Sequence, residues 1–160
     1  MKPILNLDQL EFQGRAAGFL EARTAPISDR IGARRLGYNL TVVPPGKSAC
    51  PFHNHHVGEE MFFVLEGEGV LRYGSQEHKI RKHDVIACPP GGRDRAHQMI
   101  NTGSVDLKYL ALGTVDETEV CEYPDSNKTG VFVYEARKQP RVRALYRTET
   151  AVDYLDREKT

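Results

Sequence analysis

The chain has 160 residues, a length suited to one domain with a hydrophobic core, and its 22 basic residues equal its 22 acidic residues. This balance removes the strongest electrostatic argument for nucleic acid or an anionic membrane as the partner, and we predict neither. The chain has three cysteines, no apolar run of membrane-spanning length and no signal-peptide core near its start. These features favour a cytoplasmic protein without a disulfide framework.

Residue patterns divide the chain into three regions, which we interpret as parts of a single domain, residues 1–160. Residues 1–32 are polar and irregular, and they predict an N-terminal arm that lies on the domain or on a partner subunit. Residues 33–115 are dense in strand-forming residues. Residues 116–160 predict a C-terminal extension that packs on this middle region.

The middle region consists of short strand-forming runs separated by glycine and proline turns. Residues 36–42 alternate apolar with polar or small residues, as half-buried strands do, and residues 61–65 form a continuous apolar run. Hairpin turns are predicted at residues 74–76 and again at residues 101–104, each between two such runs. No helical period is sustained here, so the pattern predicts an all-β sandwich or barrel.

Four side chains of the middle region have the chemistry and spacing of a metal site. His53 and His55 are two residues apart in an extended stretch, so both project to the same side. Glu60 opens the apolar run, where a carboxylate without a partner would be costly to bury. A turn at Val57-Gly58 brings Glu60 back beside the histidines, and His97 completes the group if the sheet closes into a barrel.

Imidazole and carboxylate ligands suit one divalent transition metal, Zn, Mn, Fe or Ni, and the residues do not decide between them. Three histidines and one carboxylate leave about two positions of an octahedral ion for water or substrate. A histidine by itself is more often a surface or hydrogen-bonded core residue, as we expect for His56, His78 and His83.

These residues resemble the two sequence motifs of the cupin superfamily, over about residues 36–115. The first motif is matched by the glycines and ligands at Gly46, His53, His55, Glu60 and Gly67. The second is matched by Pro89-Pro90-Gly91, His97 and Asn101. The resemblance implies a double-stranded β-helix, the jelly-roll barrel, with the four ligands inside it near one open end.

The chain departs from the cupin motifs at three points. The spacer after Gly46 is one residue longer than usual, and His83 stands where the second motif has its leading glycine. Five residues rather than two separate Gly91 from His97. We expect this longer loop to alter the mouth of the site without removing the ligand.

Several other polar residues are candidates for contact with a substrate. Arg93 and Arg95 lie in the lengthened loop and could bind a carboxylate or phosphate, although charged loops are more often only solvated. Tyr38, Arg72 and Tyr109 lie on predicted strands and would contribute if their register turns them toward the cavity. No catalytic residue is assigned from the sequence. Glu59 would be a general base only if its side chain faced the metal cluster, and strand alternation directs it to the opposite face from Glu60.

Three functions fit a metal-binding cupin barrel. Small cupins that resemble this chain are often labelled sugar-phosphate isomerases, which implies a metal-dependent enzyme acting on a small polar metabolite such as a sugar or sugar phosphate. An iron-dependent dioxygenase and a non-catalytic module that binds a small ligand are the alternatives. The extra segments at both ends predict a homodimer.

Overall fold

Strands make up most of the regular structure in the computed structural model, which describes residues 3–135 and 139–158. The largest sheet contains, in spatial order, β1 (Gln13–Ala17), β2 (Leu20–Pro26), β3 (Leu36–Val43), β10 (Leu107–Thr114), β5 (Glu60–Glu66) and β8 (Val85–Cys88). A second sheet contains β7 (Gln76–Arg81), β6 (Glu68–Tyr73) and β9 (His97–Ile100), and a third contains β13 (Val142–Arg147), β12 (Lys128–Val133), β11 (Thr118–Tyr123) and β4 (Asn54–His55). The described helices are single turns: η1 (Leu7–Gln9), α1 (Ser28–Ile31), η2 (Arg93–Arg95), η3 (Pro124–Ser126) and η4 (Thr148–Thr150).

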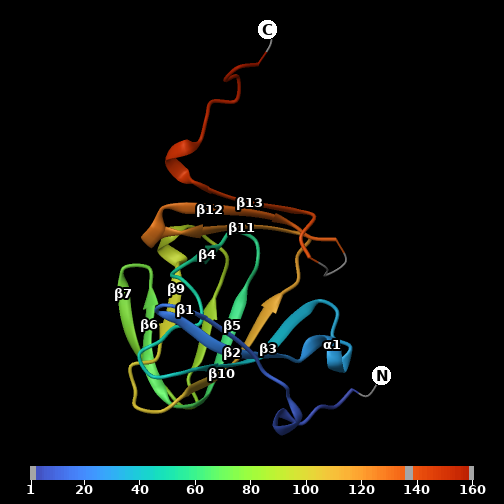
Figure 1. Ribbon diagram of the computed structural model, residues 1–160, viewed down its shortest axis with the longest axis vertical. Helices are drawn as coiled ribbons and strands as arrows, with labels where there is room; N and C mark the ends of the chain where they lie inside the picture. Colours follow the sequence, from blue (N-terminus) through green and yellow to red (C-terminus); the bar gives the residue numbers. More distant parts are fainter. Residues whose placement is uncertain (1–2, 136–138, 159–160) are drawn as a thin grey trace.

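The predicted double-stranded β-helix is confirmed (Figure 1). The inward faces of the first two sheets enclose one apolar core, in which Val64 and Leu107 are fully buried. Alternation along the strands separates the two faces of each sheet. On β3, Val43 points into this core, whereas Leu40 points to the opposite face and packs in a second apolar cluster.

One of the two predicted hairpins is confirmed and the other is wrong. Strands β6 and β7 pair in antiparallel register around Gly74 and Ser75. The segment 101–104 does not join a hairpin, because β9 pairs with β6 while β10 lies between β3 and β5. The buried Asn101 side chain holds this crossover by donating hydrogen bonds to the carbonyls of Val43 and Val105, both 2.8 Å.

The N-terminal region is more regular than the predicted arm. Strand β1 pairs with β2, and β2 extends the main sheet by pairing with β3. Residues before and after this pair, among them Leu10 and Ile27, cover the outer apolar face of the same sheet around Leu40. The sequence pattern missed β1 because every residue of this strand is exposed, so it carries no alternation of apolar and polar residues.

The C-terminal extension forms most of the third sheet. Figure 1 shows β11, β12 and β13 lying across one end of the barrel, and the chain after η4 extends away from it. Strand β11 is attached to the barrel through β4, where Cys121 is the register partner of His55. The extension therefore meets the barrel at the predicted ligands. None of the helices in the described ranges has the length and apolarity needed to cross a bilayer.

Candidate metal centre

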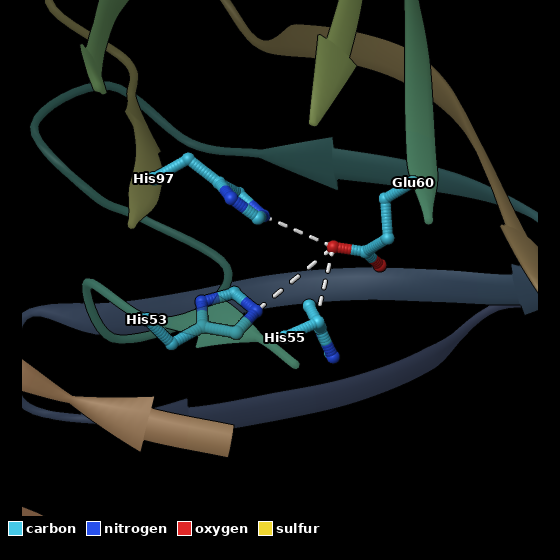
Figure 2. A group of neighbouring side chains, drawn as sticks. All are labelled: His53, His55, Glu60 and His97. Atoms are coloured by element: carbon cyan, nitrogen blue, oxygen red, sulfur yellow. Dashed lines mark hydrogen bonds and ion pairs between the residues drawn. The ribbon is translucent and has the colours of Figure 1, made fainter. Parts of the chain in front are cut away.

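The four predicted ligands, drawn from three separate stretches of the chain, converge beside the pairing of β4 with β11 (Figure 2). His53 pairs with His97 of β9 through their backbones, while His55 lies on β4 and Glu60 begins β5. One ligand atom from each residue lies within 4.8 Å of the others. The Nε2 atoms of His97, His55 and His53 lie 3.0, 3.3 and 4.0 Å from Glu60 Oε2.

Each of the three imidazole rings is oriented by a contact at its other nitrogen. Nδ1 of His53 lies 2.8 Å from the Pro51 carbonyl oxygen, and Nδ1 of His97 lies 3.2 Å from that of Arg95. Nδ1 of His55 lies 3.2 Å from a carboxylate oxygen of Glu119. An acceptor at Nδ1 keeps the ring proton there and leaves the Nε2 lone pair directed at the centre, as in metal-binding histidines.

The charges within the cluster also fit a cation. Burial by itself would raise the pKa of Glu60, but the adjacent imidazoles of His55 and His97 lower it below its ordinary range, so Glu60 is ionised. Burial, together with the neighbouring His97 and His55, lowers the pKa of His53 to about 4, so this ligand is neutral at neutral pH. An ionised carboxylate beside neutral imidazole is the donor set that a divalent transition metal requires.

His55 carries the clearest mark of a missing partner. Its Nε2 is buried and makes no hydrogen bond within the described residues, although Glu60 Oε2 is 3.3 Å away. Burial opposes protonation of this ring, but contacts with Cys121, Glu119 and Glu60 outweigh it and raise the pKa of His55 to about 12. A metal bound at Nε2 would replace that proton and satisfy the buried atom.

Two cavities adjoin the cluster, and Glu60 lines both. The inner cavity, about 210 Å³, lies within the barrel; its wall includes the polar side chains Thr24, Asn39, Thr41 and Tyr109 and the apolar Phe62, Met99 and Ala111. The outer cavity, about 300 Å³, is lined by His55, Glu59, Asp116, Glu119 and Tyr134 among others. The side chain of Glu59 is thus exposed in the outer cavity rather than directed into the barrel.

Of the five residues considered for substrate contact, the structure places Tyr109 in the wall of the inner cavity. Tyr38 packs against the apolar cluster on the opposite face of the sheet. Arg93 and Arg95 are exposed on η2, where Arg93 contacts Glu122 and Asn127, and Arg95 contacts Tyr73 and Asp94.

The fifth residue, Arg72, is held away from the cluster. Its guanidinium forms two hydrogen bonds to Asp125, 2.7 and 3.0 Å, and stacks over the ring of Phe52 at 4.2 Å. Because Asp125 is 55% exposed, we expect Asp125→Asn to lower the free energy of unfolding by less than about 1 kcal/mol. Urea denaturation would measure this, and metal content should be unchanged.

The residue of the site that the sequence interpretation missed is Glu119. Its carboxylate is largely buried, contacts His55 and accepts hydrogen bonds from the backbone N–H groups of Val57 and Gly58. A β-carbon on Gly58 would lie 2.6 Å from a Glu119 oxygen, so this approach requires glycine. The signal of Glu119 in the sequence was weaker than that of Glu60, because polar Thr118 precedes it and apolar residues follow only at Val120 and Cys121, and it lies outside the cupin motifs.

Comparison with known proteins agrees with this arrangement. Residues 39–113 match the family model described as the cupin domain. An uncharacterized protein of Methanocaldococcus jannaschii is 31% identical over 85 residues, which are 51% of this chain and 65% of that protein. The oxalate-binding protein of Thermotoga maritima is 34% identical over 70 residues, 44% of this chain and 54% of that protein. The matches therefore span less than two thirds of these relatives' lengths.

A solved structure extends the likeness to nearly the whole chain. A protein from Silicibacter pomeroyi, described as a sugar phosphate isomerase from a cupin superfamily, superposes with a TM-score of 0.79 and 26% identity, covering 96% of this chain and 98% of that one. The fold, the matched domain and the order of the two motifs lead to the same conclusion: residues 39–113 form a cupin domain, in a chain that shares its fold with a cupin-superfamily structure.

Proposed function

We propose that this cupin binds one divalent transition metal through His53, His55, Glu60 and His97 and acts as a metal-dependent enzyme on a small polar metabolite. The observation that carries the proposal is the orientation of the three imidazoles. All three have an acceptor at Nδ1 and direct Nε2 toward one carboxylate oxygen. The Pro51 and Arg95 carbonyls that orient His53 and His97 are each two residues before the ring, whereas His55 is oriented by the distant Glu119 carboxylate.

The chemistry that suits this site is isomerisation of a carbonyl compound, the class named for the Silicibacter relative. A bound metal would polarise a carbonyl or hold adjacent hydroxyls. The residues of the chain contribute the remainder: Phe62 and Met99 exclude water from the inner cavity, and the polar wall opposite the ligands orients the bound molecule.

A second candidate, a binding protein without catalysis, is favoured by one observation. Besides the ligands His53, Glu60 and His97, the ionisable side chains that line the inner cavity are Cys50 and Tyr109. Burial raises the pKa of the Cys50 thiol to about 12, and burial raises that of Tyr109 well above its ordinary value. Neither group is poised to accept a proton near neutral pH, and the name of the Thermotoga relative is that of a binding protein.

Metal analysis tests the proposal directly. We expect the purified chain to hold close to one transition-metal ion per molecule and His53→Ala to hold almost none after the same dialysis. His78→Ala is the matched control, because His78 is an exposed histidine on β7. Circular dichroism would show whether both variants keep the β-barrel. Full metal content in a folded His53→Ala protein would contradict the proposed ligand set.

A further inference from the structure

We infer that two copies of this chain form a dimer in which the C-terminal tail of each copy, residues 151–158, covers an exposed apolar surface on the barrel of the other. This surface is the outer side of β5 and β8, here termed the outer apolar face. Neither the tail nor the outer side of these strands contributes a proposed metal ligand, so the dimer is independent of the proposed metal site. The assignment of a surface and a segment goes beyond the homodimer expected from the sequence.

The outer side of the main sheet carries two complete rows of apolar residues. Strand pairing aligns β3, β10, β5 and β8 so that one residue of each strand belongs to each row, and the rows are two residues apart. Phe62 and Ile86, which alternate with these residues along β5 and β8, lie in the barrel core, so both rows point outward. The first row is Tyr38, Leu112, Met61 and Ala87, and the second is Leu40, Leu110, Phe63 and Val85.

The N-terminal region covers the half of these rows that lies on β3 and β10. There Leu40 and Leu110 pack with N-terminal side chains in the second apolar cluster. On the other half, Met61 is 40% and Val85 is 63% exposed, and Ala87, the register partner of Met61, is exposed as well. Strand β8 is the last strand of the main sheet, so no further strand of the described residues shields this edge. A contiguous apolar patch of this kind marks an interaction surface.

The C-terminal tail carries the matching apolar side chains. Val152, Tyr154 and Leu155 are 73%, 92% and 60% exposed, and the acids Asp153 and Asp156 are interspersed with them. In an extended segment, residues 152 and 154 lie on one side about 7 Å apart, which is also the separation of the two rows along the strands. The tail therefore fits the outer apolar face in chemistry and in spacing.

The root of the tail is held on the other side of the barrel from this face. Asn127, the C-cap of η3, donates a hydrogen bond to Glu149 of η4, and Asp125 of η3 pairs with Arg72 of β6. Strand β6 belongs to the second sheet, whereas the outer apolar face is the outward side of the main sheet. Figure 1 shows the chain after η4 leading away from the barrel. We therefore place the tail on a second copy rather than on its own barrel.

The charges at the edge of the face complement those of the tail. Arg81 and Lys82, both exposed, directly precede β8. The acid between them and the strand, Asp84, already accepts a hydrogen bond from the backbone N–H of Arg81. The acidic residues of the tail would meet this basic edge at the rim of the contact, where ion pairs fix the orientation of the partners more than their affinity.

The accessible surface of the chain is large enough to include such an interface. A compact monomer of 18.0 kDa is expected to expose about 8,000 Å². This chain exposes 10465 Å². The excess of about 2,400 Å² is larger than the roughly 800 Å² that each partner buries in a standard interface. Two identical contacts of tail on face, related by a two-fold axis, close the assembly at a dimer.

Sedimentation velocity of the full chain at micromolar concentration tests the assignment. We expect wild type to be a dimer and Val85→Glu to raise the dissociation constant of the dimer at least about 100-fold, because a carboxylate would be buried in each of the two contacts. Tyr154→Ser combined with Leu155→Ser should have an effect of the same size, since apolar area is lost from both contacts. Phe19→Glu is the matched control: Phe19 is 49% exposed at the turn between β1 and β2, the opposite edge of the main sheet, and this variant should remain a dimer.

A mixture of the two dissociating variants provides a complementary result. Val85→Glu keeps an intact tail and the tail variant keeps an intact face, so the mixture should contain heterodimers at a concentration at which neither variant dimerises alone. Wild type that sediments as a monomer, a Val85→Glu dimer, or a mixture without heterodimers would overturn the inference. A tail variant that stays a dimer would also overturn it, because the two faces would then pack directly on each other. Unchanged circular dichroism and metal content in each variant would separate dissociation from unfolding.

Discussion

Glu60→Gln should lower the affinity for a divalent metal by more than about 100-fold. Glu60 is the anionic member of the proposed ligand set, and its Oε2 is the atom toward which the three Nε2 atoms converge. Loss of a partner that only orients a ligand costs about 10- to 100-fold in affinity, so loss of a ligand itself should cost more. Competition with a chromophoric chelator would measure the change.

Glu59→Gln is the matched control for this experiment. The two acids are adjacent in sequence, but the Glu59 side chain is exposed in the outer cavity, and its backbone N–H donates to the hydroxyl of Thr114. We expect the affinity of Glu59→Gln to stay within about twofold of wild type, the small effect of a screened surface charge. Equal losses in the two variants would show that general negative charge, rather than coordination by Glu60, attracts the metal.

Glu119→Gln should lower metal affinity by about 10- to 100-fold, although the side chain is outside the proposed ligand set. The carboxylate accepts the Nδ1 proton of His55 and is held by the backbone N–H groups of Val57 and Gly58. Oε2 of Glu119 is the oxygen that contacts both Gly58 and His55, whereas Oε1 accepts from Val57. A Gln that keeps its carbonyl oxygen at the Val57 N–H therefore turns its amide group toward His55. The ring would then accept at Nδ1 and carry its proton on Nε2, the atom needed for the metal.

Glu122→Gln separates this effect from a general loss of charge on β11. Glu122 lies on the same strand, but it contacts His56, Asn54 and Arg93 instead of a proposed ligand. Its metal affinity should match that of wild type. Urea denaturation of the metal-free proteins provides a second readout, and a Glu119→Gln variant that loses stability but keeps full affinity would show that Glu119 only supports the fold.

Glu119 connects the C-terminal extension to the candidate metal site, because its carboxylate contacts Nδ1 of the proposed ligand His55. The match to the cupin-domain family model ends at residue 113, whereas Glu119 and Cys121 come from β11 and contact His55 from outside the barrel. The pairing of β11 with β4 fixes the backbone of His55 at the same time. Removal of the extension should therefore impair metal binding even though every proposed ligand remains.

Much of the barrel and the candidate ligand set could be predicted from local patterns. The spacing of His53 and His55 places both rings on one side of any extended chain, and an acid at the start of an apolar run implied a partner for Glu60. These signals are short-range and depend only on the geometry of a strand. The hairpin at residues 74–76 was predictable for the same reason.

Tertiary structure alone decided the features that depend on which strands are neighbours. The sequence around Asn101 resembles a hairpin turn, yet β10 pairs with β3 and β5 because the closed barrel buries more apolar surface than a local hairpin could. The same long-range pairing turned Tyr109 into the cavity, turned Tyr38 away from it and brought Glu119 behind His55. Strand alternation defines two faces, but the burial of one of them against distant strands determines which face is inside.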